Sequence, residues 1–426
     1  FMPVMNEHLL QFIWQHLYFN RENLQTVSHE PVAIKTQGLL NSNQGPDFLH
    51  ATIHVNNVTW VGNVELHLKT SDWAKHGHTN DPHYQNIILH VVYEHDQTEV
   101  NGIPVLELKD RISTSLLQRY EQFMLQDTFI PCAKQAKDVN EIVWSSWKER
   151  MIAERLQQKS EHITGILNNT KQHWEETFWQ FLARSFGTPL NADAFEAVAQ
   201  TIPVTLLAKH KKQIHQVEAM LMGQAGLLNE KFTEDYPVML QKEYKFLQNK
   251  YQLKPVSHLL HFLRMRPSNF PTIRLAQLAM LVHQSSHLFS KVLEAKTIDA
   301  IRNMFSVTAN DYWHYHYLLN EPAAFRKKQL GKTMVDNLLI NCIIPVLFVY
   351  AAEHNDEPAK EKAVQWLQQM NKEQNNITQQ WETIGVTHQS AFDSQALLYL
   401  KKNYCDAKRC LHCAIGNSLL KKTITS

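Results

Sequence analysis

Acidic and basic side chains occur around residues 47 and 65 in a pattern that suits metal chemistry. Asp47 follows a Gly-Pro turn, and Glu65, His67 and Lys69 alternate with apolar residues. Because alternate side chains of a strand face the same side, we expect Glu65, His67 and Lys69 to share one face. If this strand lies beside Asp47, the carboxylates of Asp47 and Glu65 would hold Mg²⁺ or Mn²⁺. His67 or Lys69 would then position or deprotonate a water that attacks a phosphodiester.

The same four residues also fit the solvent-facing edge of a sheet with ordinary salt bridges, which any exposed strand face carries. A row of carboxylate, imidazole and ammonium groups is costly to bury unless it is paired or bound to a metal. The two interpretations differ in geometry. Asp47 and Glu65 can share one ion only if their carboxylates lie within about 5 Å, since Mg²⁺ binds its ligands at about 2.1 Å.

The order of these residues resembles the active-site pattern of the PD-(D/E)xK nuclease superfamily. In that superfamily a Pro-Asp pair starts one strand, an acidic-x-Lys triplet lies on the next, and a helix and an apolar strand follow. Pro46-Asp47 and the apolar run Ile87–Tyr93 match this order, and Glu7 in an N-terminal helix is a possible accessory acid. His67 stands where the superfamily normally has lysine, so the resemblance bears on the fold more than on catalysis.

The resemblance implies a restriction-endonuclease-like mixed sheet flanked by helices. It also implies a Mg²⁺- or Mn²⁺-dependent nuclease acting on DNA or RNA, with Asp47 and Glu65 as metal ligands and His67 or Lys69 near the attacking water. The alternative is a non-catalytic scaffold on a degenerate nuclease fold that binds nucleic acid or a protein partner.

A histidine-rich segment follows this region and offers further ligands. His76, His78 and Asp81 are donor types that transition metals prefer, and together they would suit a zinc-dependent hydrolase. His76 and His78 would also fit the wall of a nuclease-like cleft, in contact with phosphate, and a plain polar loop remains a third interpretation. His90 lies within an apolar strand, where we expect a buried histidine, although it could face the same side as Glu65.

Two further patterns lie outside this region. Arg264, Arg266 and Arg274 surround Pro271, and a helix that starts there would offer an anion site with arginines beside it. The same arginines would equally tie the helix start to acidic neighbours.

Cys405, Cys410 and Cys413 have a spacing that suits Zn²⁺ or an iron–sulfur cluster, with Cys132, Cys342 or a histidine as the fourth ligand. Three reduced cysteines packed against a helix end are the alternative.

Composition limits the class of protein. The 426 residues carry a net charge of +1, so no overall field draws the chain to nucleic acid or an anionic membrane. The longest apolar stretch, 340–352, is too short for a membrane helix and contains Pro345. Five unevenly spaced cysteines do not form a disulfide framework, and the start of the chain lacks a secretory signal, which favours a reducing cytoplasm. The oligomeric state is left open.

The chain length predicts two domains. Residues 1–130 are expected to form an α/β domain and residues 131–426 a larger all-helical domain. In the first, the pattern predicts a helix over 7–19 and strands over 32–35, 51–55, 59–69, 87–93 and 105–108, with a helical segment between the third and fourth strands. In the second, the clearest helix is predicted over 174–186, between a tryptophan and a Gly-Thr-Pro stop.

The whole chain is also similar to an uncharacterised bacterial family catalogued as domain of unknown function 2851. The similarity rests on Gly45-Pro46-Asp47-Phe48, Val64-Glu65-Leu66-His67, Ser71-Asp72-Trp73, Leu89-His90-Val91-Val92, Arg264-Met265-Arg266-Pro267, Asn269-Phe270-Pro271 and the C-terminal cysteines. It implies one architecture over nearly all the chain and assigns no activity.

Overall fold

The computed structural model describes residues 5–41, 44–76, 84–97, 102–258, 260–285 and 287–421. The chain divides into two compact units, each assembled from separate segments. The first unit comprises Phe1–Met151, Gln374–His388 and Ala396–Ser426, and the second comprises Ile152–Glu373 and Gln389–Gln395. The C-terminal segment therefore belongs with the N-terminal one. The boundary at residue 130 stays a prediction about independently folding domains.

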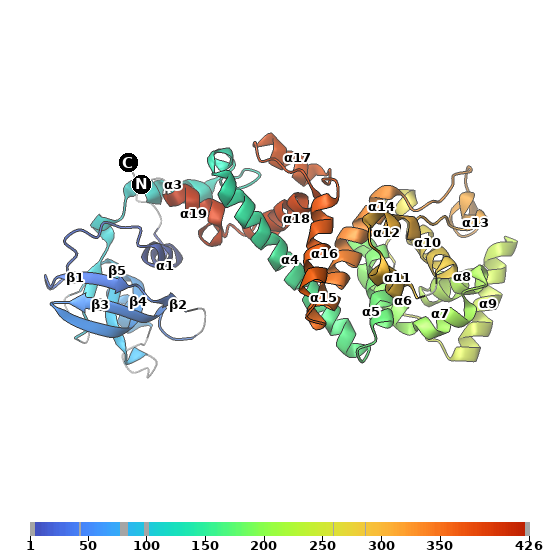
Figure 1. Ribbon diagram of the computed structural model, residues 1–426, viewed down its shortest axis with the longest axis horizontal. Helices are drawn as coiled ribbons and strands as arrows, with labels where there is room; N and C mark the ends of the chain where they lie inside the picture. Colours follow the sequence, from blue (N-terminus) through green and yellow to red (C-terminus); the bar gives the residue numbers. More distant parts are fainter. Residues whose placement is uncertain are drawn as a thin grey trace. The chain divides into compact units, whose positions relative to one another are not determined.

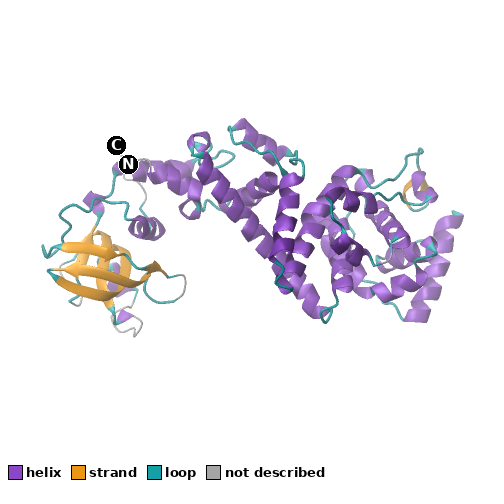
Figure 2. Ribbon diagram, viewed as in Figure 1, coloured by secondary structure: helices purple, strands orange, loops and turns teal. Residues whose placement is uncertain are grey.

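A mixed sheet forms the centre of the α/β part of the first unit (Figures 1 and 2). Its strands are β1 (Val32–Thr36), β2 (Leu39–Leu40), β3 (Phe48–Val55), β4 (Val58–Lys69), β5 (Ile87–Glu94) and β6 (Val105–Glu107). The strand order is β1-β3-β4-β5-β6, and β2 pairs with β3. The first three pairings around β3 are antiparallel, whereas β4–β5 and β5–β6 are parallel. All five strands predicted from the sequence are present.

The turn between β3 and β4 sets the register that matters for the site. Asn56 and Asn57 both have positive φ, 46° and 64°, which is the conformation of a tight two-residue hairpin turn. Val55 therefore pairs with Val58, and further along the hairpin Phe48 pairs with Val64. Asp47, directly before β3, is thus carried to the segment of β4 that holds Glu65.

Helix α1 (Glu7–His16) packs against β4. Asn6 caps it by accepting a hydrogen bond from the Leu9 N–H at 2.9 Å, and Leu17 ends it in the left-handed conformation. The helix is shorter than the predicted range 7–19 because of this turn. Its apolar side is buried, and the polar side chains of its first two turns remain available to the sheet.

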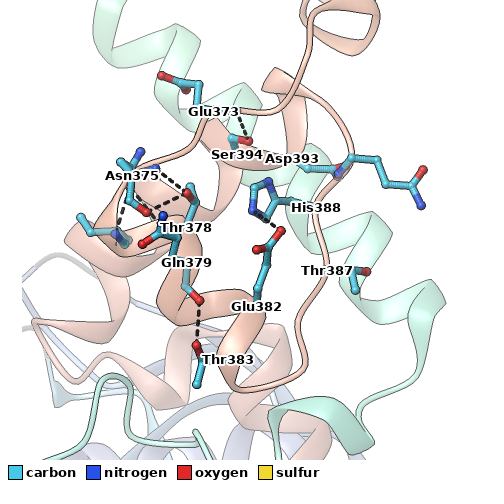
Figure 3. A network of polar contacts seen from close by, with 12 residues as sticks. Glu373, Asn375, Thr378, Gln379, Glu382, Thr383, Thr387, His388, Asp393 and Ser394 are labelled. Atoms are coloured by element: carbon cyan, nitrogen blue, oxygen red, sulfur yellow. Dashed lines mark hydrogen bonds and ion pairs between the residues drawn. The ribbon is translucent and has the colours of Figure 1, made fainter.

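The remaining helical elements of the first unit connect and follow the sheet. They are α2 (Asp72–Lys75), η3 (Lys109–Arg111), α3 (Thr114–Leu125), η4 (Ala136–Asp138), the start of α4 (Glu141–Asn169), α17 (Asn376–Thr383), the second half of α18 (Ala391–Leu400), η7 (Lys401–Cys405), η8 (Cys410–His412) and α19 (Ala414–Lys421). Figure 3 shows the polar contacts around α17, where Asn375 and Thr378 form a capping box and His388 lies 3.3 Å from Glu382.

The second unit is mostly helical. Its helices are the rest of α4, α5 (Trp174–Phe186), α6 (Thr188–Thr201), α7 (Val204–His210), α8 (Ile214–Gln224), α9 (Asp235–Tyr251), η5 (Pro267–Asn269), α10 (Pro271–Gln284), α11 (Leu288–Glu294), α12 (Ile298–Met304), α13 (Asp311–His314), α14 (Lys332–Leu338), η6 (Leu339–Ile343), α15 (Ile344–Glu353) and α16 (Glu357–Gln369). The prediction of an all-helical remainder was wrong in one respect. A small hairpin, β7 (His316–Leu318) and β8 (Glu321–Pro322), lies within it.

The helical stretch Lys332–Glu353 is long and apolar enough to cross a membrane by length and composition alone. However, 67% of its most apolar window is buried inside the protein. This burial is that of a core helix, and the apolar stretch 340–352 is part of a helical stretch longer than the apolar run alone indicated. A cytoplasmic location stays a prediction.

Candidate metal centre

Two acidic side chains meet where β3 begins beside β4. The Asp47 backbone N–H donates to Glu65 Oε2 at 3.0 Å, and the Leu66 backbone N–H donates to Asp47 Oδ2 at 3.0 Å. Each carboxylate is thus held by the backbone of the neighbouring strand. The sequence predicted this meeting from the turn before Asp47 and the alternation around Glu65.

Both carboxylates are largely withdrawn from water, and Glu65 is only 5% exposed. Burial raises the pKa of Asp47 to about 6, although hydrogen bonds from Leu66 and Gln11 oppose the rise. Burial also raises the pKa of Glu65 to about 9, and repulsion from Asp47 and Glu7 adds to it. Without a cation the pair therefore retains a proton near neutral pH. The positive charge of a divalent cation between them would offset both shifts, so the donor set fits a metal ion.

His67 extends this pair into a cluster. It is 1% exposed, and its Nε2 lies 3.8 Å from Glu65 Oε1. The same nitrogen lies 3.2 Å from His76 Nδ1, and His67 Nδ1 lies 2.9 Å from His90 Nε2. A histidine that binds a metal through one nitrogen is normally oriented through the other. His90, on the adjacent parallel strand β5, provides that second contact for His67.

Helix α1 closes the cluster from the opposite side. Gln11 Nε2 donates to Asp47 Oδ1 at 2.8 Å. A carboxylate oxygen of Glu7 lies within 4.8 Å of one ring nitrogen of His67 and of one ring nitrogen of His76. These two nitrogens are also within 4.8 Å of each other. The accessory role predicted for Glu7 stays a prediction. Gln11 was not predicted, and the available signal was its spacing of four from Glu7 on one helix face.

Lys69 does not join this cluster. Its side chain is exposed at the end of β4, where its charge lowers the pKa of Glu94 and Asp96 after their nearer hydrogen-bond partners. The alternation of β4 continues to Lys69, which pairs with Glu94 of β5, so Lys69 lies on the predicted face but beyond its buried part. A role for Lys69 near the attacking water stays a prediction. His78, like Asp81, lies outside the described residues.

The predicted arginine site belongs to the second unit. Arg274 is 7% exposed and donates to Gln277 Oε1 at 2.9 Å and to Asn269 Oδ1 at 2.7 Å. Its guanidinium thus ties η5 to α10 through two neutral amides, whereas the structural interpretation predicted acidic neighbours. Arg264 and Arg266 are exposed before η5, and their role in substrate binding stays a prediction.

The predicted cysteine site lies in the first unit, at η7, η8 and the start of α19. Cys342 lies in η6 of the second unit, where burial raises the pKa of its thiol to about 12.

The molecule thus combines a mixed α/β sheet that carries a buried acid-and-histidine cluster with a mostly helical unit. The chain belongs to the family described as "Protein of unknown function (DUF2851)", whose profile matches residues 7–376. This confirms the family predicted from the sequence, and the match includes the acid-and-histidine cluster and ends before the three C-terminal cysteines. Comparisons with curated proteins and with solved structures gave no match.

Proposed function

We propose that this protein is a metal-dependent phosphodiesterase that cleaves nucleic acid, with its active site at the acid-and-histidine cluster of the first unit. The observation that carries the proposal is the pair formed by Asp47 and Glu65. Glu65 is buried and accepts from the Asp47 N–H, whereas Asp47 is partly buried and accepts from the Leu66 N–H. The pKa values of both carboxyl groups are raised. Such a pair is stabilised by a divalent cation and costly without one.

The order of elements supports a restriction-endonuclease-like assignment for this unit. Helix α1 is followed by the antiparallel strands β1, β3 and β4, then by the short helix α2 and by β5, which pairs parallel with β4. Asp47 directly precedes one strand and Glu65 lies on the next, as in the PD-(D/E)xK pattern. The departure is His67, which occupies the position of the usual lysine.

In the proposed reaction, Asp47 and Glu65 would hold the cation, and His67 would be a further ligand from β4. The bound cation would polarise a phosphoryl oxygen and lower the pKa of a water. His76 is exposed beside His67 and is placed to accept a proton or contact phosphate. Because imidazole suits transition metals better than Mg²⁺, we expect Mn²⁺ to support more activity than Mg²⁺.

The test is a cleavage assay with the full chain, single- and double-stranded DNA and RNA, and Mg²⁺ or Mn²⁺. Asp47→Asn and Glu65→Gln should each abolish cleavage, because each keeps the shape of the side chain and removes a ligand charge. Glu22→Gln is the matched control, since it makes the same change at an exposed position of the first unit. Cleavage that survives both site substitutions would refute the proposal.

Absence of cleavage on every substrate, together with Mn²⁺ binding that needs Asp47 and Glu65, would favour the alternative of a non-catalytic scaffold. Metal binding is therefore measured on the same preparations.

A further inference from the structure

Three cysteines lie within a compact turn of the first unit. Cys405 ends η7, Cys410 begins η8, and Cys413 directly precedes α19. The segment that carries these cysteines requires a glycine at position 416, near the start of α19, because a Cβ at Gly416 would lie 2.4 Å from the Cys410 carbonyl oxygen. The backbone of Cys410 is therefore pressed onto α19, which brings its thiol towards that of Cys413.

A fourth cysteine reaches the same place from a distant part of the sequence. Cys132 follows α3, and the segment around it is held against η7 by Lys401, whose ammonium lies 5.2 Å from the Phe129 ring centroid. Lys408 also donates to the Met124 carbonyl oxygen.

The elements that carry these cysteines contact one another, because η8 packs against both η7 and α19, and α19 packs against α3, which Cys132 follows. Burial raises the pKa of the Cys132 thiol, and the sulfurs of Cys413 and Cys410 raise it further. Cys405 responds, after burial, to all three of the other sulfurs. None of the four forms a disulfide bond in the described chain.

One of these sulfurs lies among N–H groups. Burial raises the pKa of the Cys413 thiol, and the nearby N–H groups of Gly416, Ile415 and Trp147 partly oppose that rise. The Trp147 indole nitrogen is buried and has no hydrogen-bond partner among the described residues. N–H groups close to a sulfur stabilise its thiolate, as they do around cysteines that bind metal.

We propose that Cys132, Cys405, Cys410 and Cys413 together ligate an iron–sulfur cluster. Cys132 is the fourth ligand that the C-terminal spacing lacks, and it comes from the same unit. The site is separate from the acid-and-histidine cluster, and the inference does not rest on the proposed nuclease activity.

The spacing of the sulfurs favours a cluster over a single zinc ion. In a tetrahedral zinc site, Zn–S bonds of about 2.3 Å place the sulfurs about 3.8 Å apart. No three of these cysteines have sulfurs that all lie within 4.8 Å of one another. Among the residues that the structure describes, the group of potential ligands that meets this distance is Glu7, His67 and His76. A cluster distributes its thiolates over several irons and tolerates the wider spacing. The C-x4-C-x2-C run also matches a known iron–sulfur spacing.

Such a cluster would join the segment after α3 to the C-terminal segment. These two parts of the first unit are separated in the chain by the whole of the second unit. Two lysines offset part of the negative charge of the thiolates. Lys401 lowers the pKa of Cys405, and Lys408 lowers the pKa of Cys410. In both cases burial has the larger effect and raises the pKa. We therefore expect the cluster to be a structural tie between the segments.

The test uses the full chain, purified without oxygen or reconstituted with iron and sulfide. Iron, acid-labile sulfide and zinc are measured per chain, together with visible absorption. We expect iron and sulfide in equal amounts, and the loss of both in Cys132→Ser. Cys342→Ser, which changes a buried cysteine of the second unit, is the matched control and should retain the cluster.

One zinc ion per chain without sulfide, or no metal at all, would overturn the proposal, and so would a Cys132→Ser variant that keeps full iron and sulfide. If Cys132→Ser does not fold, Trp147→Phe provides a second measurement. It removes the indole N–H near Cys413 and leaves the ligands, so it should shift the reduction potential of the cluster. An unchanged potential would contradict the placement of Cys413 as a ligand.

Discussion

Glu65→Gln should stabilise the metal-free protein at high pH. The pKa of Glu65 in the folded protein is about 9, well above its ordinary value of 4.5. Between these two values the folded protein holds a proton that the unfolded chain has released. The stability that this proton provides is complete below pH 4.5 and is lost as the pH rises towards 9. Glutamine never ionises, so the variant does not suffer this loss.

The size of the effect follows from the linkage relation. When only the folded state holds a proton, the free energy of unfolding falls by up to about 1.4 kcal/mol for each unit by which the pH rises. From pH 6 to pH 8, the variant should therefore gain up to about 3 kcal/mol relative to the wild type. Glutamine preserves the shape of the side chain, and its amide oxygen can still accept from the Asp47 N–H.

Hydrogen exchange of the β4 amides in excess EDTA measures this difference, because it reports the opening of the sheet alone and does not require both units to unfold together. Wild type and variant are compared at pH 6 and at pH 8. A difference that is the same at both pH values would refute the raised pKa of Glu65. The exposed control Glu22→Gln should leave the free energy of opening of the β4 amides unchanged at both pH values.

Three further predictions concern the site and the packing of the second unit. Mn²⁺ affinity should rise from pH 5 to pH 8, because the ion must displace protons from Asp47 and Glu65. Calorimetry in two buffers should detect the released protons, and an affinity that does not depend on pH would contradict the assigned ligands. His90→Phe should weaken Mn²⁺ binding about 10- to 100-fold by leaving His67 without its orienting contact, whereas unchanged affinity would mean that His67 is not a ligand. Gly223→Ala should destabilise the protein by about 1–3 kcal/mol, because the added Cβ would lie 2.2 Å from the Tyr244 ring. Gly165→Ala, where a Cβ meets nothing within 4 Å, should instead be neutral or stabilising in the same denaturation experiment.

The candidate site was only partly accessible to sequence reasoning. Asp47 and Glu65 could be paired from the sequence, since an eight-residue strand, a two-residue turn and the next strand form a local hairpin. The role of His90 depended on which face of β5 it occupies. The sequence could not show this, because apolar residues fill almost every position of β5 and do not alternate with polar ones. Alternation also could not show that Lys69 lies outside the buried cluster, because the end of β4 extends into solvent, where the packing that buries Glu65 and His67 stops.

The sequence by itself determined the local elements of this protein. The strands, the capped start of α1 and the helix Trp174–Phe186 follow from the spacing of apolar residues and from residues that favour caps and turns. Only the tertiary structure decided which distant segments meet. It brought Glu7 to the two histidines, placed Cys132 among the C-terminal cysteines, and returned the end of the chain to the first unit. The physical reason is that backbone preferences act over a few residues, whereas contacts between distant segments depend on the burial of complementary surfaces in the folded chain.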